Sequence, residues 1–278
     1  MPDHKILCGS HTLTWSPKRP LVMGIVNVTP DSFSGDGLRG QTDAAFDQAM
    51  RMMAAGADLI DVGAESTRPG AQPVAVDEEL NRLLPLLEKL NAAGVPVSVD
   101  TTKAQVMAES IRRGAGLIND ISALGEAEAA GVVAPHAAVS VCLMHMQGEP
   151  RSMQAAPEYV DVVAEVREFL LSAEGAAIAA GIDRTRLILD PGFGFGKTFA
   201  HNQALFRALP GLVALGLPVL VGVSRKTMIG HVLDKPVNER VIGSVTAAML
   251  AAQYGAAMVR VHDVPETVDA LKVLQALG

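Results

Sequence analysis

Short apolar runs and longer mixed segments alternate along the whole chain. Eight of the runs are rich in Val, Ile and Leu and are nearly continuous, as expected for parallel strands that are buried on both faces. These predicted strands occupy residues 21–28, 58–63, 96–100, 117–122, 139–146, 187–192, 218–224 and 258–263.

Segments with helical spacing of apolar residues follow the runs. They cover residues 42–55, 77–92, 103–113, 126–135, 158–180, 202–216, 239–255 and 265–277. Six of them end at a glycine, which predicts a left-handed residue at the end of each helix; these are Gly56, Gly94, Gly114, Gly181, Gly216 and Gly255. A strand followed by a helix, eight times, predicts an α/β protein with a single (β/α)8 TIM barrel.

The first residues have a different pattern. The stretch KILCGSHTLTW turns around Gly9 and Ser10, which predicts a two-stranded β-ribbon within residues 1–18 that closes the bottom of the barrel. Since no linker or low-complexity segment interrupts the rest, we expect residues 1–278 to form one domain.

Composition narrows the classes of partner. The formal net charge is −7, which argues against nucleic acid or an anionic membrane as the main partner. No secretory signal pattern and no apolar run of membrane-spanning length occurs, so we expect a cytoplasmic protein. The two cysteines are too few for a disulfide framework, and Cys142, inside an apolar run, is expected to be a small buried residue.

The stretch DPGFGFGKT at 190–198 resembles a nucleotide-binding loop but does not fit one. A phosphate-binding P-loop needs glycine at the position of Pro191, and proline has no N–H to offer a phosphate. The evenly spaced Gly192, Gly194 and Gly196 do not match the dinucleotide fingerprint either.

Polar side chains gather at the carboxyl ends of the predicted strands, where TIM barrels carry their chemistry. Each has a plain structural alternative: Asp100 could cap a helix, Asn119 with Asp120 could satisfy a turn, and Lys226 could be solvated. Their number at one end of the barrel favours a ligand site. The set is Asn27, the 65–68 turn, Asp100, Asn119, Asp190, the 224–226 group, Arg260 and His262.

Seven motifs together resemble the dihydropteroate synthase family. They are NVTPDSFS at 27–34, DVGAESTRPG at 61–70, VSVD at 97–100, INDIS at 118–122, DPGFGFGK at 190–197, VGVSRK at 221–226 and VRVH at 259–262. The resemblance implies a transferase of folate biosynthesis that joins a dihydropterin methyl diphosphate to 4-aminobenzoate. Two departures are SFSGDG at 32–37, which leaves the role of Asp36 open, and Ala64 in place of a glycine.

The resemblance implies which residues bind the pterin. Asp190 and Asn119 would pair with its guanidine-like edge, Asp100 would accept from N8–H, and Lys226 would donate to the O4/N5 side. Thr67, Gly222 and Met144 would also contact the pterin diphosphate, Met144 as an apolar surface against the ring.

The diphosphate would be held by cations and a metal. The resemblance places Arg260, His262 and Asn27 there, with Mg2+ as cofactor and Asn27 as its protein ligand. The catalytic residues would then be Asp100, Lys226, Arg260 and His262, which favour departure of diphosphate and capture of a delocalised cation by the arylamine.

The 4-aminobenzoate would meet Ser224 and the N–H groups that open the helix after the seventh strand. Lys197 and Thr198 are expected to lie outside the site, in solvent. The residues that would form the wall of this subsite are Phe33, Thr67, Arg68, Pro69 and Phe195.

Two other functions stay open on the sequence. A pterin-dependent methyltransferase barrel shares the Asp and Asn contacts but has no diphosphate to hold, and a non-catalytic barrel would only bind a pterin or a partner. Apolar residues in the last helices predict a homodimer.

Overall fold

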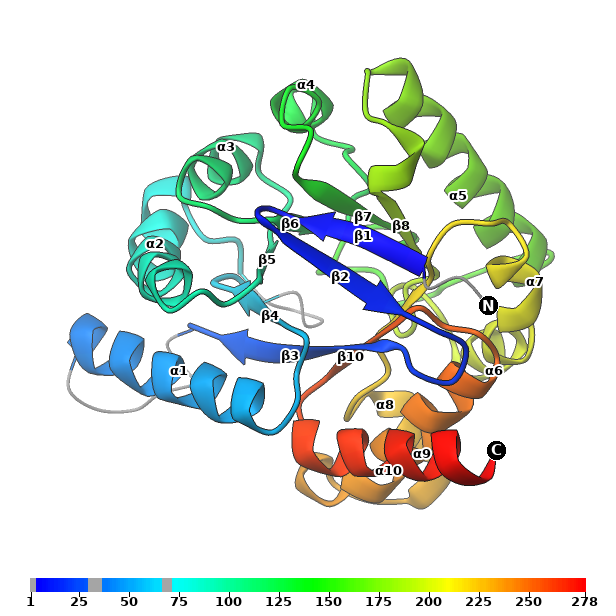
Figure 1. Cartoon of the computed structure of the whole chain (residues 1–278). Helices are drawn as coiled ribbons and strands as arrows, with labels where there is room; N and C mark the ends of the chain where they lie inside the picture. The colour runs from blue at the N-terminus through cyan, green and yellow to red at the C-terminus, as the bar shows by residue number, and fades with distance from the viewer. Residues whose placement is uncertain (1–3, 30–36, 67–71) are drawn as a thin grey trace.

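The computed structural model describes residues 4–29, 37–66 and 72–278. A hairpin is followed by eight parallel strands with helices between them, so the predicted TIM barrel is confirmed (Figure 1). The hairpin strands are β1 (His4–Cys8) and β2 (His11–Trp15). The barrel strands are β3 (Leu21–Asn27), β4 (Leu59–Gly63), β5 (Val97–Asp100), β6 (Leu117–Asp120), β7 (Ser140–Met144), β8 (Leu187–Asp190), β9 (Leu220–Val221) and β10 (Met258–Val261).

Helices cover the outside of the ring of strands (Figure 1). They are α1 (Gly37–Ala54), α2 (Val76–Ala92), α3 (Ala104–Arg112), α4 (Ala129–Val133), α5 (Val162–Ala179), α6 (Phe199–Arg207), α7 (Leu209–Val213), α8 (Thr227–Leu233), α9 (Val241–Gln253) and α10 (Val264–Leu277). Two 3-10 turns, η1 (Arg184–Arg186) and η2 (Val237–Glu239), complete the described elements.

The sheet closes on itself. Its strand order is β8-β7-β6-β5-β4-β3-β10-β9, with every pair parallel. A parallel bridge between Leu189 and Val219 joins the two outer strands, and the N–H of Leu189 donates to the carbonyl of Pro218 at 2.9 Å. The two strands at the ends of this order, β8 and β9, therefore lie side by side, which closes the barrel.

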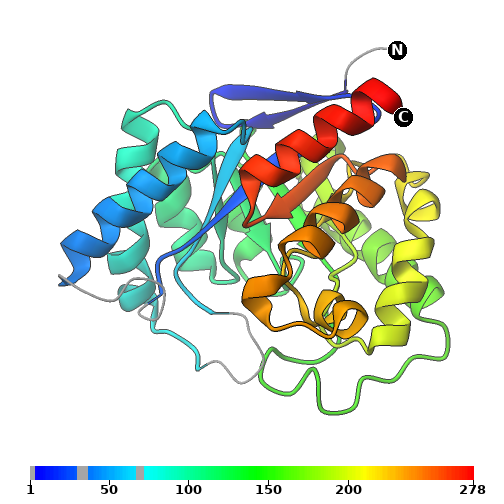
Figure 2. The same cartoon turned by 90° about the horizontal axis from the view of Figure 1, so that it is seen from below.

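The hairpin covers the amino-terminal end of the barrel (Figure 2). Its Ile6, Cys8 and Leu13 pack against the residues that begin the barrel strands, such as Leu21 and Leu59, in one apolar cluster. Contact is close at Gly116, where an added Cβ would lie 2.2 Å from the carbonyl carbon of Cys8. The predicted ribbon at the bottom of the barrel is thus confirmed.

Two helix predictions differ from the structure. The predicted helix at 202–216 is two helices, because the ring of Pro210 cannot continue the hydrogen-bond pattern of α6 and instead stands in the first turn of α7. Helix α8 does not appear among the predicted segments. It is seven residues long and ends at Asp234 in a left-handed conformation, too short to show a helical period.

The predicted helix ends and the cysteine environments are confirmed. All six glycines at the helix ends have positive φ, between 73° and 104°. Cys8 and Cys142 are both buried and free, and burial raises the pKa of Cys8 to about 12. In the described part of the chain, no helix combines the length and the apolar character needed to cross a membrane.

Candidate active site

A row of residues runs level across four neighbouring strands at the carboxyl end of the barrel. Asn27 pairs in register with Gly63, Gly63 with Asp100, and Asp100 with Asn119. Residues in register point to the same face of a sheet, so this row faces the barrel interior. A Cβ added at Gly63 would lie 3.4 Å from Oδ1 of Asn27 and 3.8 Å from Oδ2 of Asp100. Because Gly63 has no side chain, space remains between these two acceptor oxygens.

Arg260 is held by two carboxylates, Asp100 of this row and Asp61, which comes earlier in β4. Its Nε donates to Oδ2 of Asp61 at 2.6 Å and its Nη2 donates to Oδ2 of Asp100 at 2.8 Å. Asp61 is fully buried, and it also accepts from Oγ of Ser98 at 2.6 Å and from Nδ2 of Asn119 at 3.2 Å. Asp61 therefore connects the side chains of three other strands.

The sequence reasoning missed Asp61 because it searched strand ends, whereas Asp61 lies in the middle of β4. One signal was present: an acidic residue inside the apolar run DLIDVG. A carboxylate is almost never fully buried without a partner, so such a residue predicts a buried cation nearby.

Burial and ion pairing set the charges of this group. Burial raises the pKa of Asp100 to about 7, although the adjacent Arg260 favours its charged form. Burial alone would lower the pKa of Arg260, but Asp61 and Asp100 together raise it, so the guanidinium stays charged.

Asp190 and Lys226 form a second charged group. Asp190 ends β8 level with Met144 of β7, and its Oδ1 accepts from the N–H of Gly192 at 2.7 Å. Nζ of Lys226 donates to the carbonyl of Phe193 at 2.6 Å and lies 4.6 Å from the ring centroid of Phe195. Lys226 is therefore not a solvated lysine, and the predicted Phe195 stands beside it.

The charges of this pair are also perturbed. Burial raises the pKa of Asp190, opposed by Lys226. Burial lowers the pKa of Lys226 to about 8, opposed by Asp190. A Cβ added at Gly222 would lie 4.0 Å from Nζ of Lys226 and 3.8 Å from Cβ of Arg260, so this glycine keeps the space between the two cations open.

Ser224 and His262 lie together just after the neighbouring strands β9 and β10. Oγ of Ser224 is 3.0 Å from Nδ1 of His262 and accepts from the backbone N–H of His262 at 3.2 Å. The two residues are 38 positions apart in the chain, and the pairing of β9 with β10 brings their strand ends together.

The structural alternatives for Asp100 and Asn119 are answered by their neighbours. The first N–H groups of α3 are taken by Oγ1 of Thr101 and by Oε2 of Glu126, so the cap does not depend on Asp100. Asp120, not Asn119, satisfies the following turn, accepting from Ser122 and Leu124.

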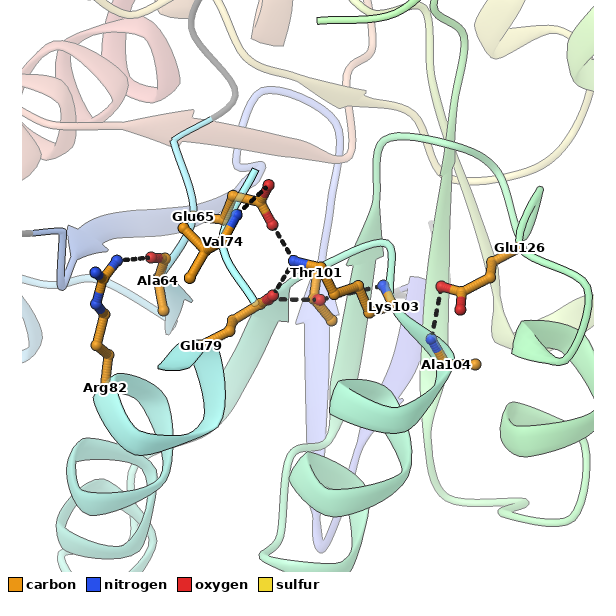
Figure 3. Close-up of polar contacts among 9 residues, drawn as sticks. All are labelled: Ala64, Glu65, Val74, Glu79, Arg82, Thr101, Lys103, Ala104 and Glu126. Carbon is orange, nitrogen blue, oxygen red and sulfur yellow. Dashed lines mark hydrogen bonds and ion pairs between the residues drawn. The ribbon is translucent and has the colours of Figure 1, made fainter. Parts of the chain in front are cut away.

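Glu65, from the predicted 65–68 turn, is engaged by the protein itself (Figure 3). Its Oε1 accepts from the N–H of Val74 at 3.3 Å, and its other oxygen pairs with Lys103, which also pairs with the buried Glu79. Thr101 donates to the same Glu79 at 2.7 Å. Glu65, which follows β4, thus contacts Val74 just before α2 and Lys103 just before α3.

The prediction that Lys197 is solvated is wrong. The side chain is buried with 3% exposure, and Nζ donates to the carbonyls of Gly192 and Phe195, each at 3.0 Å. Thr198 is exposed as expected, but its side chain accepts from the N–H of His201 and caps α6. Lys197 can be buried because carbonyls of the glycine-rich turn accept hydrogen bonds from its ammonium.

Five further residues from the sequence prediction lie outside the described residues. They are Phe33, Asp36, Thr67, Arg68 and Pro69.

Comparison with known proteins gives one family. The sequence model of the family "Pterin binding enzyme" matches residues 23–262. The dihydropteroate synthase of Escherichia coli (strain K12) is 49% identical over 258 residues, which cover 92% of this chain and 91% of that protein.

Solved structures agree over nearly the whole chain. The Xanthomonas albilineans dihydropteroate synthase with 4-aminobenzoic acid has a TM-score of 0.93 and 50% identity, covering 99% of this chain and 98% of that one. The same enzyme in complex with 7,8-dihydropteroate has a TM-score of 0.88 and 48% identity, with 98% of each chain covered. The Yersinia pestis dihydropteroate synthase with a sulfonamide drug has a TM-score of 0.91 and 49% identity, covering 97% of this chain and 98% of that one. Because the family match spans most of the chain and these relatives share about half of its residues, the chain belongs to the dihydropteroate synthase family of pterin-binding transferases.

Proposed function

We propose that the protein condenses 6-hydroxymethyl-7,8-dihydropterin diphosphate with 4-aminobenzoate, giving 7,8-dihydropteroate and diphosphate in folate biosynthesis. The observation that carries this proposal is the buried Asp61–Arg260–Asp100 chain beside the Asp190–Lys226 pair. It places two cations and three carboxylates within one barrel interior, where a polar heterocycle with an anionic tail can be bound. The family membership supports the same reaction.

The pterin end needs donors and acceptors on rigid supports. Asp190 can accept from the 2-amino and N3 positions, and the amide of Asn119 can pair with the neighbouring edge. Lys226 can donate to the O4/N5 side from its position against Phe193 and Phe195. Asp190 is the last residue of β8 and Asn119 lies within β6, so both side chains stand on rigid strands and little freedom is lost on binding.

Asp100 can accept from N8–H of the ring while it remains paired with Arg260. That contact strengthens as positive charge develops on the pterin, which is the condition for stabilising the transition state rather than the substrate. The C–O bond at the exocyclic methylene breaks and its electron pair leaves with diphosphate. The amine nitrogen of 4-aminobenzoate then forms the new C–N bond and loses a proton to solvent.

The leaving diphosphate would meet Arg260 and His262, with Asn27 on the adjacent strand β3. Within residues 4–29, 37–66 and 72–278 no cluster of three or more His, Cys, Asp or Glu could hold a metal, so Mg2+ would bind mainly through the diphosphate. Mg2+ usually keeps several waters and binds through few protein oxygens and substrate phosphates, so Oδ1 of Asn27 is a suitable single ligand. When bound, it would neutralise charge on the diphosphate.

The 4-aminobenzoate would lie between Ser224 and Phe195. The hydroxyl of Ser224 can donate to the carboxylate, and the ring of Phe195 offers an apolar wall next to the pterin position. This arrangement also suits sulfonamides, whose aniline and acidic group resemble the two ends of 4-aminobenzoate.

We also propose a cytoplasmic homodimer. Three apolar side chains on α8, η2 and the start of α9 are strongly exposed: Val232 at 66%, Val237 at 55% and Ile242 at 78%. Covering such residues with a second copy would remove them from water. Sedimentation at micromolar concentration tests the dimer, and Ile242→Glu should give a monomer. The two free cysteines suit a reducing compartment.

The test of function is direct. Pure protein, dihydropterin diphosphate, 4-aminobenzoate and Mg2+ should yield dihydropteroate and diphosphate in equal amounts. Binding of the pterin without any product would instead indicate a non-catalytic barrel. Methyl transfer from a methylated pterin to a corrinoid protein, with no dihydropteroate formed, would indicate a methyltransferase.

A further inference from the structure

The reaction proposed above makes no use of Lys197, yet its ammonium is surrounded by acceptors. Besides the carbonyls of Gly192 and Phe195, Nζ lies 3.3 Å from the carbonyl of His145 and 2.8 Å from its Nδ1. An ammonium has three N–H donors. Four acceptors converging on one buried cation indicate that the surrounding backbone is organised around it.

The turn that Lys197 closes has an irregular backbone, whose N–H of Gly194 donates to Oδ1 of Asn202 and whose Gly196 carbonyl accepts from Tyr159. Gly192, Gly194 and Gly196 all have positive φ, at 68°, 80° and 61°. A Cβ at Gly192 would lie 1.9 Å from the carbonyl oxygen of His145, so the turn is pressed directly onto the end of β7. The close approach crowds the carbonyls of two segments together, and a buried cation offsets their repulsion.

The opposite side of the same turn forms the pterin end of the site. The N–H of Gly192 orients Oδ1 of Asp190, the carbonyl of Phe193 accepts from Lys226, and the ring of Phe195 lies over that ammonium. The turn is therefore held between two lysines, Lys197 behind it and Lys226 in front.

We propose that Lys197 is a positioning residue for pterin binding: its buried ammonium fixes the 190–197 turn and thereby the directions of Asp190, Phe193 and Phe195. This inference rests on the proposed function, since it assigns the pterin to the site formed by these three residues.

The charges around Lys197 bear on this role. Burial and the charge of Lys197 together lower the pKa of His145 to about 3, so its ring is neutral. Burial lowers the pKa of Lys197 to about 7, with Asp190 favouring the ammonium and Lys226 opposing it, so the ammonium that holds the turn is fully formed below this pH and is lost as the pH rises above it. The ammonium is thus supported by Asp190, the residue that it helps to orient.

The test compares two neighbouring substitutions. Lys197→Met keeps the length of the side chain and removes its donors. It should weaken equilibrium binding of dihydropterin diphosphate by about tenfold or more, with a smaller rise in KM for 4-aminobenzoate, whose subsite shares only Phe195 with the turn. Thr198→Ala is the matched control: it removes the cap of α6 and should lower thermal stability, but it should leave pterin affinity and the wild-type turnover unchanged.

The outcomes separate the inference from the proposed function. Wild-type protein that fails to bind dihydropterin diphosphate would overturn the proposed function itself. Wild-type binding that Lys197→Met retains in full would overturn the inference. If Lys197→Met does not fold, Lys197→Gln, which keeps two donors, should show an intermediate loss of affinity, and unchanged affinity there would contradict the role equally.

Discussion

At the scale of single residues, buried charges that satisfy one another define the site. Asp61 is the member that contacts no predicted ligand, yet it holds Arg260, Ser98 and Asn119 at once. A buried carboxylate of this kind sets the direction of the side chains around it, because each of them loses a strong hydrogen bond by moving.

The first prediction concerns Asp61→Asn. The amide has nearly the same shape but no charge, so Arg260 keeps only Asp100 as an ionic partner. We expect the fold to persist and kcat/KM to fall by about tenfold or more. This matches the loss of about 1 to 3 kcal/mol for a charge-assisted hydrogen bond. Steady-state kinetics measures the effect. Asp58→Asn, at the residue just before β4 and paired with Arg19, is the control and should keep full activity. Equal kinetics in both variants would contradict the role of Asp61.

The second prediction is a bell-shaped pH profile of kcat/KM. Asp100 must be ionised to accept from N8–H, and its pKa is about 7, so activity should fall as pH drops below this value. Lys226 must be protonated to donate, and its pKa is about 8, so activity should fall as pH rises above it. Lys226→Ala should remove most activity and leave the fold intact. The range from about pH 6 to about pH 9 extends roughly one unit beyond both pKa values. A flat profile over this range would show that neither group controls the reaction.

At the scale of elements, the hairpin and the glycines decide how closely segments approach. The hairpin is anchored by the N–H of Gly9 on the carbonyl of Ala138 at 3.0 Å and by Oγ of Ser140 on the carbonyl of Leu7 at 2.7 Å. Gly116 lies under it in direct backbone contact. The amino-terminal end of the barrel thus contributes stability, and the carboxyl end carries the site.

The third prediction is that Gly116→Ala unfolds more easily. Its Cβ would meet backbone atoms of Cys8 and Gly9 that cannot move without shifting the hairpin, so we expect the free energy of unfolding to fall by about 3 kcal/mol. Gly131→Ala in α4 is the matched control, because nothing lies within 4 Å of its added Cβ, and it should be neutral or slightly stabilising. Urea unfolding of both variants measures the difference. A similar loss in both would mean that the hairpin contact is not limiting.

At the scale of the whole molecule, the pairing of strands joins groups that bind different parts of the two substrates. The neighbouring strands β9 and β10 bring Ser224, proposed for 4-aminobenzoate, into contact with His262, proposed for diphosphate. A group held by both subsites couples them, since ordering His262 on one ligand also orders Ser224 for the other.

The fourth prediction is therefore an order of binding. Diphosphate with Mg2+ should raise the affinity for 4-aminobenzoate by about tenfold, within the usual coupling of about 1 to 3 kcal/mol, and Arg260→Ala should abolish the gain. Equilibrium binding of 4-aminobenzoate, with and without diphosphate, in wild type and variant, measures the coupling. Identical affinity under all four conditions would show that the second subsite is complete without the first.

Local sequence pattern is enough to predict the barrel and most of the polar residues at its strand ends. Each strand is a continuous apolar run, and each strand end follows its run directly, so Asp100, Asn119 and Asp190 could be placed by local pattern alone. The same local reasoning failed for α8 and for the break between α6 and α7. A helix of two turns has too few residues to show a period.

The pairing of buried charged side chains follows from the tertiary structure alone. Asp61 and Arg260 are 199 residues apart, and Lys197 reaches His145 across 52, so no local pattern could pair either of them. Lys197 in particular reads as a surface lysine after a glycine-rich turn, because sequence records which residues are polar but not which backbone carbonyls will face inward. Burial of a strand is a property of its own composition, whereas the partner of a buried charge is set by ring closure and by contacts between distant segments, and these exist only in the folded chain.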